Sequence, residues 1–143
     1  MELCITRVDE SLPMPEYQTP GSVGFDMYAR VETVVHAKSL GFIPSNLIVA
    51  VPEGFAFLVA SRSSTPRKKG LLIPHGIGVV DQDFCGPKDE ILIQVYNFTD
   101  EDVVVARGER IAQGLVMPAV RCELRETMVA SAMSRGGIGS TGA

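Results

Sequence analysis

Short runs of β-branched and aromatic residues dominate the hydrophobic pattern of the chain, and glycine or proline interrupts them at close intervals. Each run has about the length of a strand, and branched side chains pack well on a pleated sheet. The chain contains 14 glycines and 9 prolines, and we expect tight turns at residues 51–54 and 106–109. The expected strands span residues 31–37, 47–51, 55–60, 77–80, 91–98, 103–106 and 111–116.

A long apolar period of 3.6 residues is missing from the sequence, and only residues 63–69 have the composition of a short helix. Many short strands separated by turns are typical of a β-sandwich or of a barrel of the jelly-roll type. The pattern therefore predicts an all-β body over residues 1–130 with one short helix. A glycine-rich tail follows at residues 131–143.

Composition narrows the possible functions of the chain. Its 143 residues suffice for one domain with a hydrophobic core. The net charge of −4 argues against a broad nucleic-acid surface. The sequence has no signal-peptide core and no apolar run of bilayer length, so we expect no membrane partner and a cytoplasmic location. The basic residues 67–69 leave a nuclear location open. The spacing of Cys4, Cys85 and Cys122 does not favour disulfides or a zinc site.

The tail reads Arg135-Gly136-Gly137-Ile138-Gly139-Ser140-Thr141-Gly142-Ala143. Glycine loses much backbone entropy on ordering, so we expect the tail to be flexible until a ligand or partner orders it. Backbone N–H groups without a neighbouring Cβ approach anions closely, and Arg135 adds a forked donor suited to phosphate. The alternative is an ordinary frayed terminus.

Two polar patches in the first half of the chain are candidate anion or cation sites. Asp26 stands among residues with the pattern of a buried strand, where a carboxylate needs a partner. It either caps a local turn or holds the water shell of a cation. Arg62-Ser63-Ser64 comes before the expected helix, whose N–H groups favour phosphate. The alternative is a serine N-cap followed by a solvated basic face at residues 67–69.

Two further patches lie in the second half. An apolar run ends at Asp81, and we expect a hairpin whose turn lies at residues 82–83 and whose second arm begins at Phe84. Partial desolvation beside two valines suits a general base at Asp81, whereas aspartate in a turn is equally common. On a regular strand through residues 110–113, Arg110 shares a face with Ala112, and Gln113 lies on the other face.

In combination, these five patches resemble the five motifs of the homotrimeric dUTP diphosphatase (dUTPase) family, in family order and over nearly the whole chain. The matching strings are Gly24-Phe25-Asp26-Met27-Tyr28-Ala29, Ser61-Arg62-Ser63-Ser64, Gly78-Val79-Val80-Asp81-Gln82-Asp83-Phe84-Cys85-Gly86, Arg110-Ile111-Ala112-Gln113 and Gly139-Ser140-Thr141-Gly142. The resemblance implies a jelly-roll (β-clip) barrel subunit and a homotrimer with active sites between subunits. It also implies hydrolysis of dUTP to dUMP and pyrophosphate with Mg²⁺, which limits uracil incorporation into DNA and supplies dUMP for thymidylate synthesis.

The resemblance also assigns roles to individual residues. Asp81 would activate the water that attacks the α-phosphorus, and Asp26 would act on Mg²⁺ through water. The backbone from Gly76 to Val80 and from Phe84 to Ile91 would read uracil, and the Phe84 ring would lie beneath the deoxyribose. The phosphates would be held by Arg62, Ser63, Ser64 and Gln113, and the tail of another subunit would close over the substrate with Arg135, Ile138, Gly139, Ser140 and Thr141.

Three positions depart from the family pattern. Phe84 stands where the family usually has tyrosine, and Ile138 stands where it has the phenylalanine that stacks on uracil, in a tail motif two residues shorter. An aliphatic side chain forfeits base stacking, so we expect a weaker lid and a lower KM for Ile138→Phe. His75 replaces an asparagine found in some members, and as a loop residue it has no assigned role. Two alternatives remain: a dCTP deaminase-like enzyme, and a catalytically degenerate trimeric binding protein.

Overall fold

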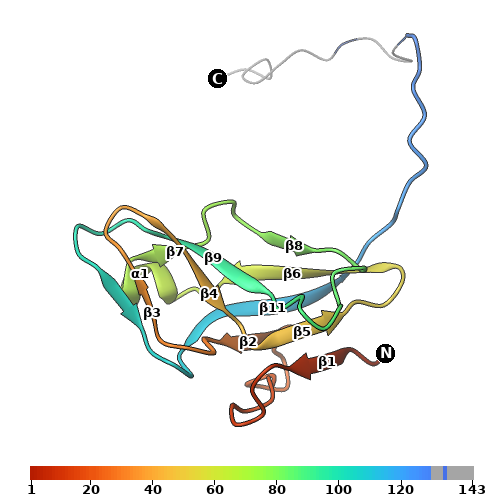
Figure 1. Cartoon of the computed structure of the whole chain (residues 1–143). Coiled ribbons are helices and arrows are strands. Elements are labelled where there is room, and N and C mark those ends of the chain that lie inside the picture. Colours follow the sequence, from red (N-terminus) through yellow and green to blue (C-terminus); the bar gives the residue numbers. More distant parts are fainter. Residues whose placement is uncertain (130–133, 135–143) are drawn as a thin grey trace.

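The computed structural model of the chain describes residues 1–129 and Ser134 and consists almost entirely of short strands (Figure 1). One short helix, α1 (Thr65–Lys69), follows the sixth strand. The strands are β1 (Cys4–Arg7), β2 (Gly24–Tyr28), β3 (Thr33–Val35), β4 (Leu40–Pro44), β5 (Leu47–Ala50), β6 (Phe55–Ser61), β7 (Leu71–Leu72), β8 (Gly78–Val80), β9 (Leu92–Asn97), β10 (Val103–Val105) and β11 (Arg110–Pro118).

Every run predicted as a strand contains one, and the predicted helix is present. The predicted turns are also confirmed: the Phe55 N–H donates to the Pro52 carbonyl at 3.1 Å, and Gly54 between them has a φ of +80°. Gly108, with a φ of +78°, serves the same purpose in the turn before β11. Both glycines occupy the left-handed region that other residues rarely adopt.

All strand pairs are antiparallel, and the sheets are small. One sheet has the order β2-β11-β6-β8, a second has the order β4-β9-β7, and β1-β5 and β3-β10 form two-stranded sheets. In the described part of the chain these sheets do not close into one continuous barrel. The prediction of a nearly all-β, jelly-roll-like fold with one short helix is confirmed.

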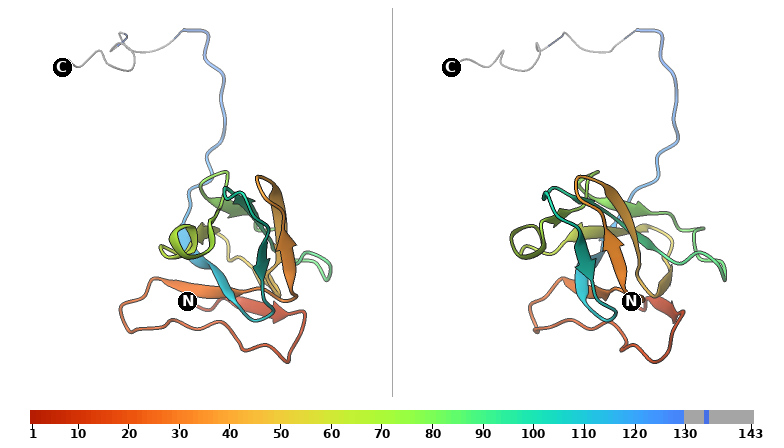
Figure 2. Two further views of the ribbon diagram at one scale, coloured as in Figure 1. Left: turned by 90° about the vertical axis from the view of Figure 1, so that its left-hand side faces the viewer. Right: turned by 60° about the vertical axis from the view of Figure 1, so that its left-hand side comes forward.

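The core lies between the inner faces of these sheets, with β4 and β9 on one side and β6 and β11 on the other (Figure 2). In β9 buried and more exposed positions alternate, as expected for a strand with one face on the core. The side chains that meet between the layers include Phe25, Met27, Phe57, Val59 and Ile111 from the first sheet and Ile43, Leu71, Ile93 and Val95 from the second.

The start of β11 departs from regular strand geometry. Arg110 pairs with Tyr28, whereas Ala112 pairs with the next residue, Met27, so Ile111 is the extra residue of a β-bulge. Ile111 and Ala112 are therefore both buried while Arg110 is exposed. The prediction that Arg110 and Ala112 share a face is wrong, because the bulge interrupts the alternation at that point.

Beyond β11 the chain leaves the body, and residues 119–129 run away from it as an exposed segment (Figure 1). Large apolar side chains in this segment, among them Leu124 and Met128, are fully or almost fully exposed. The boundary predicted at residue 130 stays a prediction. The only helix of the described residues, α1, is far too short to cross a membrane.

Candidate active site

A cavity of about 560 Å³ opens between β8 and β9. β8 is the outermost strand of its sheet, and β7 covers β9 only at Tyr96 and Asn97, so the two strands face each other with open edges. Residues predicted to bind substrate line this cavity, namely Val80, Phe84 and Ile91, together with the predicted base Asp81. The cavity is therefore a slot whose walls carry unpaired main-chain groups as well as side chains.

The structure contradicts one prediction for the nucleoside region, the hairpin, and it restricts the main-chain contacts that Ile91 and Gly76 can make with a base. The hairpin expected around Asp81 is absent, because β8 pairs with β6 and the returning chain joins the β4-β9-β7 sheet instead. The main chain of Ile91 offers no free N–H to a base, since that N–H donates to the Leu47 carbonyl at 2.9 Å. Gly76, with a φ of +79°, lies outside the residues that line the cavity.

Sequence reasoning missed several polar residues of the cavity wall. His75, Lys88 and Glu90 all line it, although the sequence assigned no role to His75. The Glu90 carboxylate forms a bidentate ion pair with Arg30, at 2.8 Å for both contacts, and also accepts the Asn46 N–H at 2.8 Å. This pairing raises the pKa of the Arg30 guanidinium. Glu90 therefore shapes the wall, since its oxygens are already engaged.

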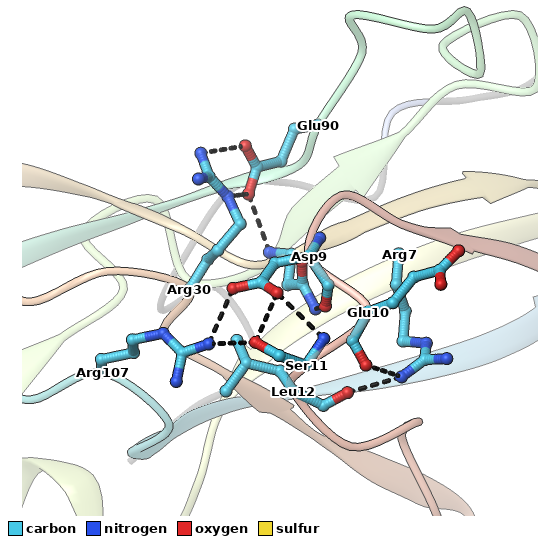
Figure 3. Close-up of polar contacts among 9 residues, drawn as sticks. Arg7, Asp9, Glu10, Ser11, Leu12, Arg30, Glu90 and Arg107 are labelled. Carbon is cyan, nitrogen blue, oxygen red and sulfur yellow. Dashed lines mark hydrogen bonds and ion pairs between the residues drawn. The ribbon is translucent and has the colours of Figure 1, made fainter.

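The same wall is tied to the N-terminal segment (Figure 3). The buried amide of Asn46 exchanges hydrogen bonds with the backbone of Asp9, at 2.6 and 3.0 Å. The Asp9 carboxylate accepts hydrogen bonds from Ser11 and, at 2.7 Å, from Arg107. These contacts hold the pKa of Asp9 well below its usual range, and the Ser11 side chain is the largest cause. The polar cluster fixes the segment that precedes β2.

A second cluster of predicted site residues surrounds Asp26. This carboxylate is 7% exposed and accepts a hydrogen bond from Arg62 Nε at 2.7 Å and one from an Arg110 terminal nitrogen at 3.1 Å. Gln113 pairs with Asp26 across β11 and β2, and its side-chain amide donates to the Ser61 carbonyl at 3.2 Å. Asp26 lies within β2 and caps no turn, so that alternative is wrong. Two arginines fixed by one buried carboxylate present cationic groups suited to phosphate.

Ser63 and Ser64 follow Arg62 immediately and lead into α1. Ser64 occupies the N-cap position, but its side chain makes no capping hydrogen bond, so the simple N-cap interpretation is not supported. Pro66 lies in the first turn, as expected. The nearby Thr65 hydroxyl instead donates to the Ile111 carbonyl at 3.1 Å and ties this segment to β11.

The two clusters lie at opposite ends of the same sheet. Val80 pairs with Phe57 near the beginning of β6, and Asp81 continues beyond that end. Arg62 follows the other end of β6, about 16 Å further along at the usual rise per residue. Within one chain, the slot with Asp81 and the arginine cluster are therefore far apart.

Comparison with known proteins identifies the kind of molecule to which these clusters belong. The family model described as dUTPase matches residues 10–142, which is most of the chain. The chain belongs to the dUTPase family. A curated relative, the deoxyuridine 5'-triphosphate nucleotidohydrolase of Anaplasma marginale (strain St. Maries), is 37% identical over 135 residues, covering 92% of this chain and 90% of the relative.

Solved dUTPases share the fold of this chain. The crystal structure of dUTPase from Streptococcus mutans superposes with a TM-score of 0.78 and 31% identity, over 83% of this chain and 98% of the other. The Staphylococcus bacteriophage 80alpha dUTPase with dUPNHPP gives 0.85 at 22% identity, over 99% of both chains. A mutant dUTPase from phage phi11 of S. aureus, which coordinates a structural Mg(II) ion, gives 0.78 at 21% identity, over 90% of this chain and 98% of the other.

The resemblance drawn from the five dUTPase motifs is thus confirmed at the level of the family. Roles of single residues stay predictions. The tail residues predicted to close over the substrate, Arg135, Ile138, Gly139, Ser140 and Thr141, lie outside the described part of this dUTPase.

Proposed function

We propose that this dUTPase, which hydrolyses dUTP to dUMP, carries out the reaction in a site that two or more copies of the chain build together and releases pyrophosphate there. The observation that carries the shared site is the separation of the two clusters along β6. A triphosphate whose nucleoside occupies the slot of one copy needs cationic partners near Asp81, and the arginine cluster of another copy can supply them.

The slot between β8 and β9 suits a nucleoside. Its volume of about 560 Å³ is in the range of small-molecule sites. The open edge of β8 offers main-chain donors and acceptors to a base, and Phe84, which is 42% exposed, offers its ring to the sugar. We propose that this ring leaves no room for a ribose 2′-hydroxyl, which would make the enzyme selective for deoxyribonucleotides.

The arginine cluster suits the phosphates. Arg62 is held by Asp26 before any substrate arrives, so little reorganisation is needed when negative charge develops. Ser63, Ser64 and Gln113 lie beside Arg62 in sequence or across the sheet and add neutral donors. In phosphoryl transfer such positioning and charge neutralisation supply most of the catalysis.

Asp81 acts as the general base in this proposal. It accepts a proton from a water molecule as the water oxygen forms a bond to the α-phosphorus, and the bond from that phosphorus to the bridging oxygen breaks to release pyrophosphate. Asp81 is exposed in the single chain, so desolvation of the carboxylate would have to come from the neighbouring copy and the substrate. Its role as base is independent of the arginine cluster and can be tested separately.

The donor set of the described residues fits Mg²⁺ held mainly by substrate phosphates. These residues contain no cluster of three or more His, Cys, Asp or Glu side chains that could cage a metal. Mg²⁺ commonly uses one or two carboxylates together with phosphates and water. The ion would neutralise charge on the triphosphate. A contact of Asp26 with the water shell of the ion, which the resemblance implies, stays a prediction, since both Asp26 oxygens already accept hydrogen bonds from arginines.

We propose a homotrimer as the assembly, following the family. The exposed apolar side chains of residues 119–129 support contacts with a neighbouring copy, since several highly exposed apolar groups in one short segment gain free energy when a partner buries them. The tail from Arg135 onward would then reach the site of another subunit.

The test is pyrophosphate release from a panel of deoxyribonucleoside and ribonucleoside triphosphates, with and without Mg²⁺. We expect rapid Mg²⁺-dependent release from dUTP, slow release from dTTP, dCTP and UTP, and loss of release in Asp81→Asn. Ammonia from dCTP would instead identify a deaminase-like enzyme, and no turnover of any nucleotide would identify a binding protein.

A further inference from the structure

The side chain of Gln82, next to the proposed base, joins two parts of the chain that are distant in sequence. Its amide nitrogen donates to the Phe55 carbonyl at 3.0 Å and to the Pro52 carbonyl at 3.3 Å. One acceptor lies in the turn before β6, and the other is the first residue of β6. One side chain thus connects the loop that carries Asp81 to the first sheet.

The loop has little else to hold it at that point. The last residue of β8 that pairs with β6 is Val80, so Asp81 lies just outside the ladder. Within the loop, the Phe84 N–H donates to the Asp81 carbonyl at 3.2 Å, which closes a turn but does not fix that turn to the body. A second cavity, of about 820 Å³, is lined by Asp81 as well, together with residues 53–56 and 119–121. Asp81 therefore borders both cavities.

The acceptor turn, in contrast, is well fixed. The Phe55 N–H donates to the Pro52 carbonyl at 3.1 Å, and the Gly54 carbonyl accepts the N–H of Ala119 at 2.9 Å. Phe57, two residues further on, is completely buried in the core. A hydrogen bond to this turn therefore fixes the loop relative to the core.

The chemistry of the contact suits glutamine in particular. A primary amide carries two N–H groups on one nitrogen, and each can donate to one of two neighbouring carbonyls. A glutamate side chain has the same length but is an acceptor when ionised, and methionine has the same length without strong donors.

We propose that Gln82 is a positioning residue, which holds the loop so that the Asp81 carboxylate faces the attacking water. This inference rests on the proposed role of Asp81 as base. A displacement of about 1 Å in a reacting group can lower a rate by about 100-fold, and a solvent-exposed pair of hydrogen bonds adds little to global stability.

The experiment compares Gln82→Met with the wild type in the full-length enzyme. We expect kcat for dUTP to fall by about 10- to 100-fold, with KM, Tm and the shape of the pH profile of kcat unchanged. Gln82→Glu should lose at least as much, because an ionised carboxylate faces two carbonyl oxygens. Glu53→Gln, a change in the same turn whose side chain makes no hydrogen bond within residues 1–129, is the control and should keep the wild-type kcat.

Wild-type kcat in Gln82→Met would overturn the inference, and so would a loss of kcat that merely follows a fall in Tm or in the fraction of folded enzyme. The variant Asp81→Asn distinguishes failure of the proposed base from failure of the positioning role of Gln82. If Asp81→Asn keeps the full rate, the proposed base is wrong. If Asp81→Asn is inactive while Gln82→Met is normal, only the positioning role fails.

Discussion

The ion pairs of Asp26 lead to a prediction that distinguishes two roles of this carboxylate: orienting Arg62, and acting on the water shell of Mg²⁺. The replacement Asp26→Asn keeps the size of the side chain and removes its charge. In the wild type each oxygen accepts from one guanidinium, Arg62 at 2.7 Å and Arg110 at 3.1 Å. An asparagine can accept from only one of them and turns its NH₂ group toward the other.

The size of the effect follows from the exposure of the three groups. The Asp26 side chain is 9% exposed and that of Arg62 is 27% exposed, so their hydrogen bond is partly shielded and contributes about 1.5–3 kcal/mol. The Arg110 side chain is 44% exposed, and solvent screening limits its ion pair to below about 1 kcal/mol. We expect Asp26→Asn to lower the free energy of unfolding by about 2 kcal/mol, measured by denaturant titration.

Activity should fall because Arg62 loses the partner that orients it. We expect a decrease in kcat/KM of about 100-fold, similar to the loss of one fixed donor at a site of developing charge. The Mg²⁺ concentration that gives half-maximal activity should stay unchanged. Arg62→Lys is the matched control: it keeps the positive charge, loses the Nε donor, and should show a similar defect.

A different result would refute this reasoning. If Asp26 acts chiefly through the water shell of Mg²⁺, Asp26→Asn will raise the half-saturating Mg²⁺ concentration, and excess Mg²⁺ will restore activity. Unchanged stability together with that shift would show that the arginine contacts contribute nothing.

Two predictions concern stability. Gly114→Ala should lower the free energy of unfolding by about 2 kcal/mol, because the new Cβ would clash with the ring of Phe57, and a denaturation curve that matches the wild type would contradict this. Asp9→Asn should lower Tm at neutral pH. Because the folded pKa of Asp9 lies below its ordinary value of 3.8, its stabilisation is complete above that value and is lost as the pH falls toward the folded pKa. The Tm difference should therefore narrow in acid, and a constant difference from neutral pH down to strong acid would count against the contacts with Ser11 and Arg107.

Local features of the fold could be predicted because short segments carry them. Branched runs such as the three valines of β10 form strands, and glycines form the turns that need a positive φ. β4 escaped prediction because Gly41 and Pro44 interrupt its apolar residues. Its place in the sheet comes from pairing with β9, which lies about 50 residues further along the chain.

The site could be predicted only in part, since its contacts depend on the tertiary structure. The motifs predicted Asp26 and Arg62 as site residues. They did not predict the ion pair between these two residues, because 36 positions separate them. The expected hairpin at Asp81 failed for a related reason: the strand after the turn found its partner in another sheet. The hydrogen bonds of Gln82 could not be predicted either. Their acceptors are main-chain carbonyls, which every residue has, so the sequence carries no signal for them.

The central claim is that one substrate takes Asp81 from one chain and Arg62 from another, and mixing two inactive variants tests it most directly. Asp81→Asn and Arg62→Ala are each purified, unfolded together in equal amounts, refolded and assayed with dUTP. Random assembly should give roughly one quarter of the wild-type activity per site, since half of the chains retain each residue and both must meet at one site. If the mixture is as inactive as either variant alone, while refolded wild type regains its rate, each site takes both residues from one chain and the shared site is wrong.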